Sequence, residues 1–198
     1  MTFDPLETAA VLFGIVSVYL SVRENIVSWP TAIVNVTLYI FVFQRARLYA
    51  DMALQVVYIG ISLYGWYEWL HGGRGKSRLA VSRGTGRLAA VLAGIGLVAA
   101  ALLGTLLARY TNAALPYLDA TTTTTSLIAQ WMMARKILEN WIVWVAVDVV
   151  YIGMFLYKSL VLTAGLYAVF LVLSLMGYFQ WKRTLRSRPS DLNSPLSA

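Results

Sequence analysis

Apolar residues gather into long runs along almost the whole chain. Stretches of roughly twenty such residues recur, and each can cross a hydrocarbon core of about 30 Å at about 1.5 Å per residue. The runs lack the alternation of a membrane barrel, and lipid offers no hydrogen-bond partner to the backbone, so they must be helices. We therefore predict an all-α integral membrane protein with seven transmembrane helices, over residues 6–20, 29–43, 50–69, 88–107, 119–133, 141–157 and 160–181.

Composition supports a membrane protein. The 198 residues are 59% hydrophobic and 13% charged, whereas a soluble domain carries about 25% charged residues. The N-terminus has no basic region and no small-residue cleavage site, so we expect the first helix to be retained. The absence of cysteine excludes disulfides and thiolate metal sites.

The basic residues lie mostly in loops on one side. The side that holds the N-terminus has 4 Lys and Arg residues, and the other side has 12. The positive-inside rule then places the N-terminus outside and the C-terminus in the cytoplasm of a bacterial inner membrane. We interpret the basic run at 74–87 as a loop that sets this topology, and we expect no nucleic-acid partner despite the net charge of +7.

The sequence repeats internally. The third and seventh spans align at an offset of 112, with Gly65 opposite Gly177 and Trp69 opposite Trp181. The second and sixth spans align at an offset of 115, which pairs Trp29 with Trp144. The span at 88–107, with no aromatic or charged residue, has no counterpart and is predicted to be a linker helix that lets two three-helix halves share one orientation. We therefore expect a first repeat at 1–70, a basic cytoplasmic loop with the linker helix at 71–110, a second repeat at 111–182 and a disordered cytoplasmic tail at 183–198.

Polar and aromatic residues form stripes on four of the predicted helices, at spacings that place them on one helix face. The candidate substrate-binding residues are Asn35, Gln55, Tyr58, Gln130, Trp141, Trp144, Asp148 and Tyr151.

Asp148 is the sharpest signal among these residues. A carboxylate in mid-span costs about 2.5 to 3.5 kcal/mol on insertion scales and usually marks a transport pathway or an ion pair. The alternative is a hydrogen bond that only holds the bundle together, and Asn35 and Gln55 also fit such a packing role. We interpret Trp29, Trp69 and Trp181, near span ends, as residues of the interfacial aromatic belt.

Four segments resemble a known family: SWPTAIVNVTLYIF, RLYADMALQVVYIGISLYGWYEW, SLIAQWMMARKILENWIVWVAVDVVYIG and GLYAVFLVLSLMGYFQW. They are similar to the PnuC family of nicotinamide riboside transporters. The resemblance implies two parallel three-helix repeats joined by a linker helix, in the three-plus-one-plus-three arrangement of SWEET proteins. It also implies facilitated diffusion that feeds NAD synthesis, with the solute between the halves against Trp141, Trp144 and Asp148, and with Gln55 and Tyr58 in the same cavity.

The candidate residues suit a cationic aromatic solute. Tryptophan and tyrosine rings can stack on a pyridinium cation, Asn35 and Gln55 can bond hydroxyls or an amide, and Asp148 can balance the charge. Thiamine is also an aromatic cation, so the residues favour a cationic vitamin and only the resemblance selects nicotinamide riboside. A thiamine or riboflavin transporter of the same family remains the alternative.

Other classes of function fit less well. With one His, no Cys, no HExxH or GxSxG motif and no P-loop, the chain offers no nucleophile, metal site or phosphate cradle. We therefore expect no enzyme activity, no cofactor and no metal. A seven-helix sensor or scaffold is a weaker alternative. The expected partners are a small vitamin-like solute and membrane lipid, and the sequence leaves the oligomeric state open, a homo-oligomer included.

Overall fold

A computed structural model describes residues 4–45, 47, 49–111, 115–157 and 159–187. The described chain is helical, with α1 (Pro5–Val22), α2 (Ser28–Arg45), α3 (Tyr49–His71), α4 (Gly86–Tyr110), α5 (Pro116–Ala134), α6 (Asn140–Tyr157) and α7 (Val161–Arg186), and a short 3-10 helix, η1 (Arg74–Lys76). Local chemistry sets several helix starts. The Asp4 carboxylate accepts from the backbone N–H of Leu6 at 2.9 Å, Thr85 caps α4 in the same way, and Pro116 begins α5.

The seven predicted helices are confirmed, with ends that agree to within a few residues. The largest difference is at α7, which continues to Arg186, so the first residues of the predicted tail are helical. Residues 188–198 of that tail lie outside the described residues. Four helices, α1, α4, α6 and α7, are clearly long and apolar enough to span a membrane. The other three, α2, α3 and α5, each carry a polar stripe, which lowers their hydropathy.

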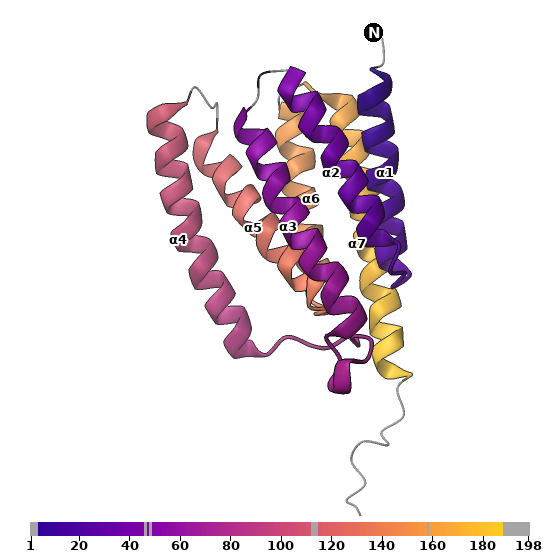
Figure 1. The fold of residues 1–198 in the computed structure, drawn as a ribbon. Coiled ribbons are helices and arrows are strands. Elements are labelled where there is room, and N and C mark those ends of the chain that lie inside the picture. Colours follow the sequence, from indigo (N-terminus) through magenta and orange to yellow (C-terminus); the bar gives the residue numbers. More distant parts are fainter. Residues whose placement is uncertain (1–3, 46, 48, 112–114, 158, 188–198) are drawn as a thin grey trace, which may run out of the picture.

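Six helices form a ring and the seventh lies outside it (Figure 1). The neighbouring pairs α1–α2, α2–α3, α3–α5, α5–α6, α6–α7 and α7–α1 close the ring. Helix α4 packs against α5 on the outer side, and most of its surface is exposed. Each half therefore has its helices in sequence order around the ring, and the halves meet at two separate places, α3 against α5 and α7 against α1.

The two halves repeat at a single offset of 112 residues. Helices α2 (Ser28–Arg45) and α6 (Asn140–Tyr157) begin and end at this offset, and α3 and α7 begin at it. The left-handed residues after α1 and α5, Glu24 (φ 53°) and Lys136 (φ 48°), follow the same offset. The offset of 115 predicted for the second and sixth spans is wrong. Trp29 lies against Gly65, and the residue that lies against Gly177 is Trp141, because each repeat packs a tryptophan on a glycine of its third helix.

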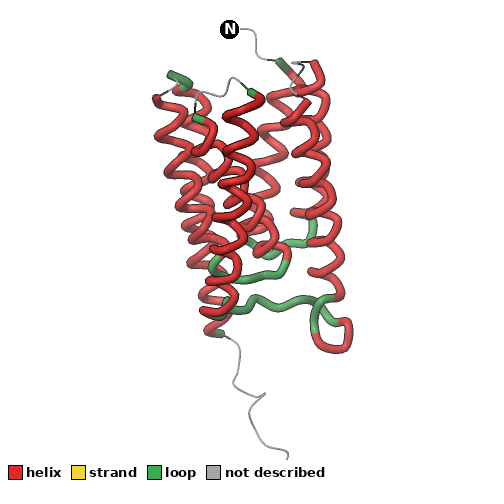
Figure 2. Tube along the Cα trace, turned by 90° about the vertical axis from the view of Figure 1, so that its left-hand side faces the viewer, coloured by secondary structure: helices red, strands yellow, loops and turns green. Residues whose placement is uncertain are grey.

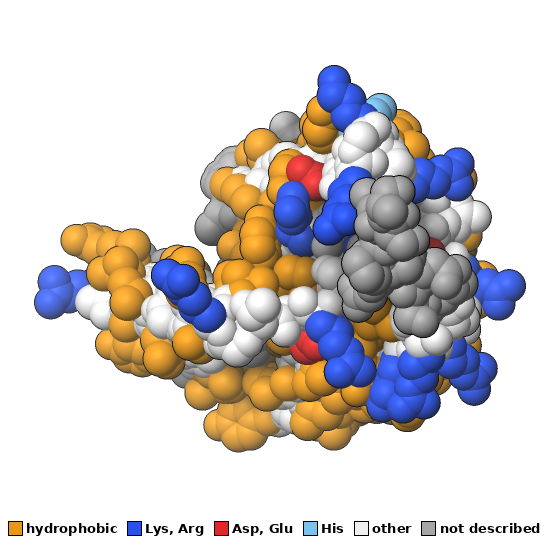
Figure 3. Space-filling view, turned by 90° about the horizontal axis from the view of Figure 1, so that it is seen from below, with side chains coloured by type: hydrophobic (Ala, Val, Ile, Leu, Met, Phe, Trp, Pro, Cys, Tyr) orange, Lys and Arg blue, Asp and Glu red, His pale blue; other side chains and the backbone are white. Residues whose placement is uncertain are grey.

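One end of the bundle, called the basic end here, carries the turns after α1 and α5, the α3–α4 connection and the end of α7. Figure 3 views this end and shows Lys and Arg side chains spread around it. Figure 2 shows the loops that cross beneath the helices. The α3–α4 connection packs against the protein, because Val81 within it is only 1% exposed and joins the apolar cluster at this end.

Candidate functional site

A cavity of about 530 Å³ lies inside the ring of six helices. Its lining comes from α1, α2, α3, α5, α6 and α7, and not from α4. At one end the cavity reaches Glu7, Phe43 and Thr163, in the outermost turns of α1, α2 and α7. Toward the basic end its lining includes Trp29 and Trp141, together with Ser21, Ser28 and Met133. The volume is within the range of roughly 300 to 1,000 Å³ that is typical of small-molecule sites.

Four tryptophans pack together at the basic end of the cavity, two of them, Trp29 and Trp141, in its lining, and this group is called the tryptophan floor below. Trp29, Trp69, Trp141 and Trp181 are each at most 3% exposed. Trp29 meets Trp69 edge to face at 5.4 Å between ring centroids, and Trp141 meets Trp181 in the same way at 5.4 Å. The predicted place of Trp29, Trp69 and Trp181 in an interfacial belt is therefore wrong, because all three are buried between the helices.

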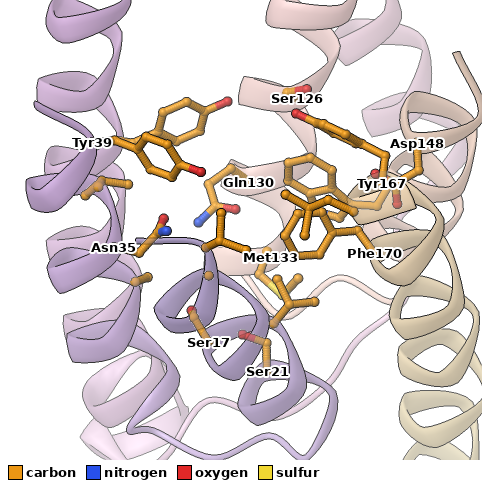
Figure 4. Close-up of a pocket in the computed structure, with 18 of the residues that line it drawn as sticks. Ser17, Ser21, Asn35, Tyr39, Ser126, Gln130, Met133, Asp148, Tyr167 and Phe170 are labelled. Carbon is orange, nitrogen blue, oxygen red and sulfur yellow. The ribbon is translucent and has the colours of Figure 1, made fainter. Parts of the chain in front are cut away.

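The first repeat supplies amides and hydroxyls to the cavity wall. Gln55 and Tyr58 line it from α3, and Asn35 and Tyr39 line it from α2. Figure 4 shows Asn35 and Tyr39 together on one side of the cavity, across from Gln130 of α5. The Asn35 side-chain N–H also donates to the backbone oxygen of Ala10 at 2.6 Å, so part of this amide holds α2 against α1.

Asp148 of α6 is the one acidic side chain in the interior of the cavity lining. It is 2% exposed, and its Oδ2 accepts a hydrogen bond from the Ser174 hydroxyl of α7 at 3.1 Å. None of the ion pairs among the described residues includes Asp148. The bond to Ser174 is the packing contact considered as the alternative, yet one neutral hydroxyl does not balance a carboxylate. A cation in the cavity would do so.

Aromatic rings from the second repeat stand beside this carboxylate. Tyr167 lies 4.7 Å from Tyr151, 5.2 Å from Phe155 and 5.9 Å from Phe170, measured between ring centroids. Figure 4 shows Tyr167 and Phe170 on the same side of the cavity as Asp148. Aromatic faces attract cations and also stack on flat rings. This wall therefore suits a flat, positively charged group.

All eight candidate residues from the sequence lie along this one cavity. They are Asn35, Gln55, Tyr58, Gln130, Trp141, Trp144, Asp148 and Tyr151. The eight candidates do not include several other polar or aromatic lining residues, among them Tyr39, Tyr167, Phe170 and Ser174. The internal repeat could have identified these residues. At the offset of 112, Tyr39 corresponds to Tyr151, and Tyr167 and Phe170 correspond to Gln55 and Tyr58.

The described residues hold no group of three or more His, Cys, Asp or Glu side chains that could bind a metal. The cavity instead offers the Asp148 carboxylate in its interior and Glu7 at its end, three amides, several hydroxyls and many aromatic faces. Such a set can bind a polar aromatic solute by stacking, hydrogen bonds and charge.

Comparison with known proteins identifies the family. The sequence model of the nicotinamide mononucleotide transporter family matches residues 4–183. The chain belongs to this family. It is therefore a multi-pass membrane protein of a vitamin transporter family and not an enzyme, and the resemblance to PnuC is confirmed.

Relatives within the nicotinamide mononucleotide transporter family differ in the solute named for them. The nicotinamide riboside transporter PnuC of Escherichia coli is 24% identical over 93% of this chain and 88% of its own length. The riboflavin/roseoflavin transporter RibM of Streptomyces davaonensis is 27% identical over 89% of this chain and 83% of its own. A crystal structure of the vitamin B3 transporter PnuC, 23% identical, covers 93% of this chain and 83% of that one with a TM-score of 0.73, which shows a shared fold.

Proposed function

We propose that this protein carries nicotinamide riboside across the inner membrane by facilitated diffusion and so supplies NAD synthesis. The observation that carries the proposal is the buried Asp148 carboxylate beside the aromatic wall, opposite amides and hydroxyls of the first repeat. The riboside has the matching parts, because its pyridinium ring is a flat cation and its ribose and carboxamide form hydrogen bonds. The E. coli and Neisseria mucosa relatives named as nicotinamide riboside transporters support the same solute.

Within the cavity, we assign the cationic ring to the wall made by Trp144, Tyr151 and Tyr167, with Asp148 as its counter-charge. The ribose and carboxamide then face Gln55 and the hydroxyls of the first repeat. Trp141 serves in this assignment as part of the floor, because it is only 1% exposed and packs on Trp181 and Gly177.

The proposal includes an orientation in the membrane. The basic end faces the cytoplasm by the positive-inside rule, so the end of the cavity at Glu7 faces outside and the tryptophan floor separates the solute from the cytoplasm. A reporter fused after Arg186 should then be cytoplasmic, and one fused near Arg109 should be external. External labelling at the end of α7 would contradict this orientation.

The transport mode is proposed to be uniport, since the chain has no nucleotide-binding motif and no described ion pair at Asp148 that would couple a driving ion. Liposomes that contain only this protein should take up labelled nicotinamide riboside until the inner concentration equals the outer one. Accumulation driven by an imposed proton gradient would contradict uniport and make the mechanism a symport.

The same liposomes test the solute. Unlabelled thiamine and riboflavin, added in excess, should compete weakly with the labelled riboside. Riboflavin is the second candidate, because RibM is named for it, although its uncharged ring does not use the charge of Asp148. Uptake of thiamine or riboflavin without uptake of the riboside would refute the solute assignment, and no uptake of any of the three would refute the transport function.

A further inference from the structure

Two equivalent seams join the halves of the ring at the basic end. Helix α3 meets α5 in one seam, and α7 meets α1 in the other. Each seam has the same indole hydrogen bond: Trp69 donates from Nε1 to the backbone oxygen of Met133 at 3.1 Å, and Trp181 donates to that of Ser21 at 3.1 Å. These pairs are related by the offset of 112. The repeat thus gives both seams one common bond.

The α3–α5 seam has further contacts. Arg135, after α5, donates to the Glu68 carboxylate of α3 at 2.8 Å and to the Tyr64 hydroxyl at 3.3 Å. The ammonium group of Lys136 lies 4.4 Å from the centre of a ring of Trp69. An ion pair and a cation–π contact therefore add to the indole bond.

The connection between the halves also closes the α3–α5 seam. Residues 77–85, called the strap here, run between η1 and α4 in extended form. The Leu79 N–H donates to the Trp69 backbone oxygen at 3.1 Å, and Ser82 exchanges two backbone bonds of 2.9 Å with the α5–α6 turn, one to Lys136 and one from Leu138. The Gly84 N–H donates to the Glu139 carboxylate at 2.7 Å. The strap therefore ties the end of α3 to the turn after α5.

The α1–α7 seam has none of these additions among the described residues. The positions equivalent to Arg135, Glu68 and Tyr64 are Arg23, Gln180 and Met176, so the ion pair cannot form. The described residues form no second strap, because the connection between the halves runs on the α3–α5 side. The Glu24–Lys136 ion pair, 3.1 Å long, joins equivalent positions of the two halves and lies between the seams.

We propose that the basic end opens at the α1–α7 seam, and that the α3–α5 seam stays closed and acts as the hinge. This inference rests on the proposed transport function, because a solute held above the tryptophan floor must leave between the halves. Rocking of two repeats about a site between them is a general transporter plan. Helix packing closes both seams, but their polar contacts are unequal. The halves therefore separate at the seam that has only the indole bond and pivot at the seam that also has the ion pair and the strap. The exit of the solute is then a gap between α1 and α7.

Cross-linking tests which seam must open. Because the sequence contains no cysteine, only the introduced cysteines can react. One variant carries Arg23→Cys with Gln180→Cys, and its matched control carries Glu68→Cys with Arg135→Cys at the equivalent positions. Each is treated in liposomes with a short reducible bifunctional thiol reagent, and mass spectrometry measures the cross-linked fraction. Cross-linking at 23 and 180 should abolish uptake of labelled riboside, with recovery on reduction. Cross-linking at 68 and 135 should leave at least half of the uptake rate.

The other outcomes overturn the proposal. Loss of uptake with both cross-links would mean that both seams open, and loss only with the 68–135 link would place the exit at α3–α5. Unchanged uptake with a complete 23–180 link would show that this seam stays closed.

Spin labels on the same cysteine pairs give a second measurement that needs no transport. The 23–180 distance should broaden toward longer values across the equilibrium ensemble, and the 68–135 distance should stay narrow. Uptake failure in the unmodified protein would refute the transport function instead, and the distances would still test the seam.

Moving the ion pair provides a further variant that keeps the fold. Gln180→Glu places a carboxylate opposite Arg23, in the geometry of Glu68 and Arg135. A partly exposed ion pair on the moving seam should slow maximal uptake by about two- to fivefold, the size expected from such pairs. Glu68→Gln removes the pair from the hinge and should slow uptake less than twofold. A slower rate for Glu68→Gln than for Gln180→Glu would contradict the proposal.

Discussion

The tryptophan floor and the cavity walls differ in how they use the internal repeat. At the floor, equivalent positions hold the same residue: Trp29 with Trp141, and Trp69 with Trp181. The edge-to-face pairs they form have interplanar angles of 90° and 87°. Both halves therefore close the basic end by the same packing.

In the walls, some equivalent positions hold the same residue, as Tyr39 and Tyr151 do, but others hold different residues. Asp148 stands where the first repeat has Val36, and Trp144 stands where it has Ala32. Gln55 of α3 corresponds to Tyr167 of α7. An asymmetric solute with a charged ring at one end needs two unlike walls, whereas a closure that both halves make together needs like residues. We infer from this comparison that the like tryptophans of the floor maintain the frame, and that the unlike residues of the walls contribute to the choice of solute.

The largest expected effect is on stability at the floor. Trp69→Ala and Trp181→Ala should each lower the free energy of unfolding by about 3 to 5 kcal/mol, because each empties a buried site and removes an indole donor. Denaturation by SDS in mixed micelles measures this. Phe179→Ala, at a 57% exposed ring of α7, is the control and should cost far less. A large difference between Trp69→Ala and Trp181→Ala would break the equivalence of the repeats.

The next largest effect on stability is expected at the two glycines that contact Trp29 and Trp141 of the floor. A Cβ at Gly65 would lie 2.3 Å from the Trp29 ring, and one at Gly177 would lie 2.5 Å from the Trp141 ring. Gly65→Ala and Gly177→Ala should each destabilise the protein by about 1 to 3 kcal/mol through overpacking. Gly60→Ala, where no atom lies within 4 Å, is the matched control in α3 and should be neutral or stabilising. The same SDS titration compares the three.

In the walls the expected effect is on affinity. Gln55→Ala should weaken binding of nicotinamide riboside by about 1 to 3 kcal/mol, because a hydroxyl or amide of the bound solute loses its partner. Calorimetric titration of the purified protein measures this, with Gln44→Ala at the exposed end of α2 as control. An affinity equal to that of the wild type in a folded Gln55→Ala variant would remove Gln55 from the site.

The smallest expected effect comes from the stacking ring. Trp144→Ala should weaken binding of the riboside by about 1 to 2 kcal/mol, the range for a desolvated cation over an aromatic face. Trp131→Ala is the matched control, since Trp131 does not line the cavity. Titration with thiamine alongside the riboside shows whether the ring selects charge or shape. Equal affinity of the wild type and the Trp144→Ala variant would indicate that the cationic ring lies elsewhere.

The sequence alone predicted the helices, their approximate ends and the two halves with a linker helix, because run length and hydropathy are local properties. It also predicted eight residues that line one cavity, because polar side chains in a membrane span are costly and face the interior. The lining residues outside this prediction include Phe170, an apolar residue that hydropathy cannot place, and Tyr167, which corresponds to Gln55 at the offset of 112.

The tertiary structure decided which apolar residues face inward. Lipid and protein interior are similarly apolar, so hydropathy does not separate a buried Trp181 from an interfacial one. Trp29 and Trp141 are identified as equivalent residues, at the offset of 112, by their packing: each ring lies against a glycine of another helix. The order of helices around the ring and the burial of Val81 in the strap likewise depend on contacts between segments far apart in the chain. Those contacts form only when the two halves come together, and a local pattern therefore cannot encode them by itself.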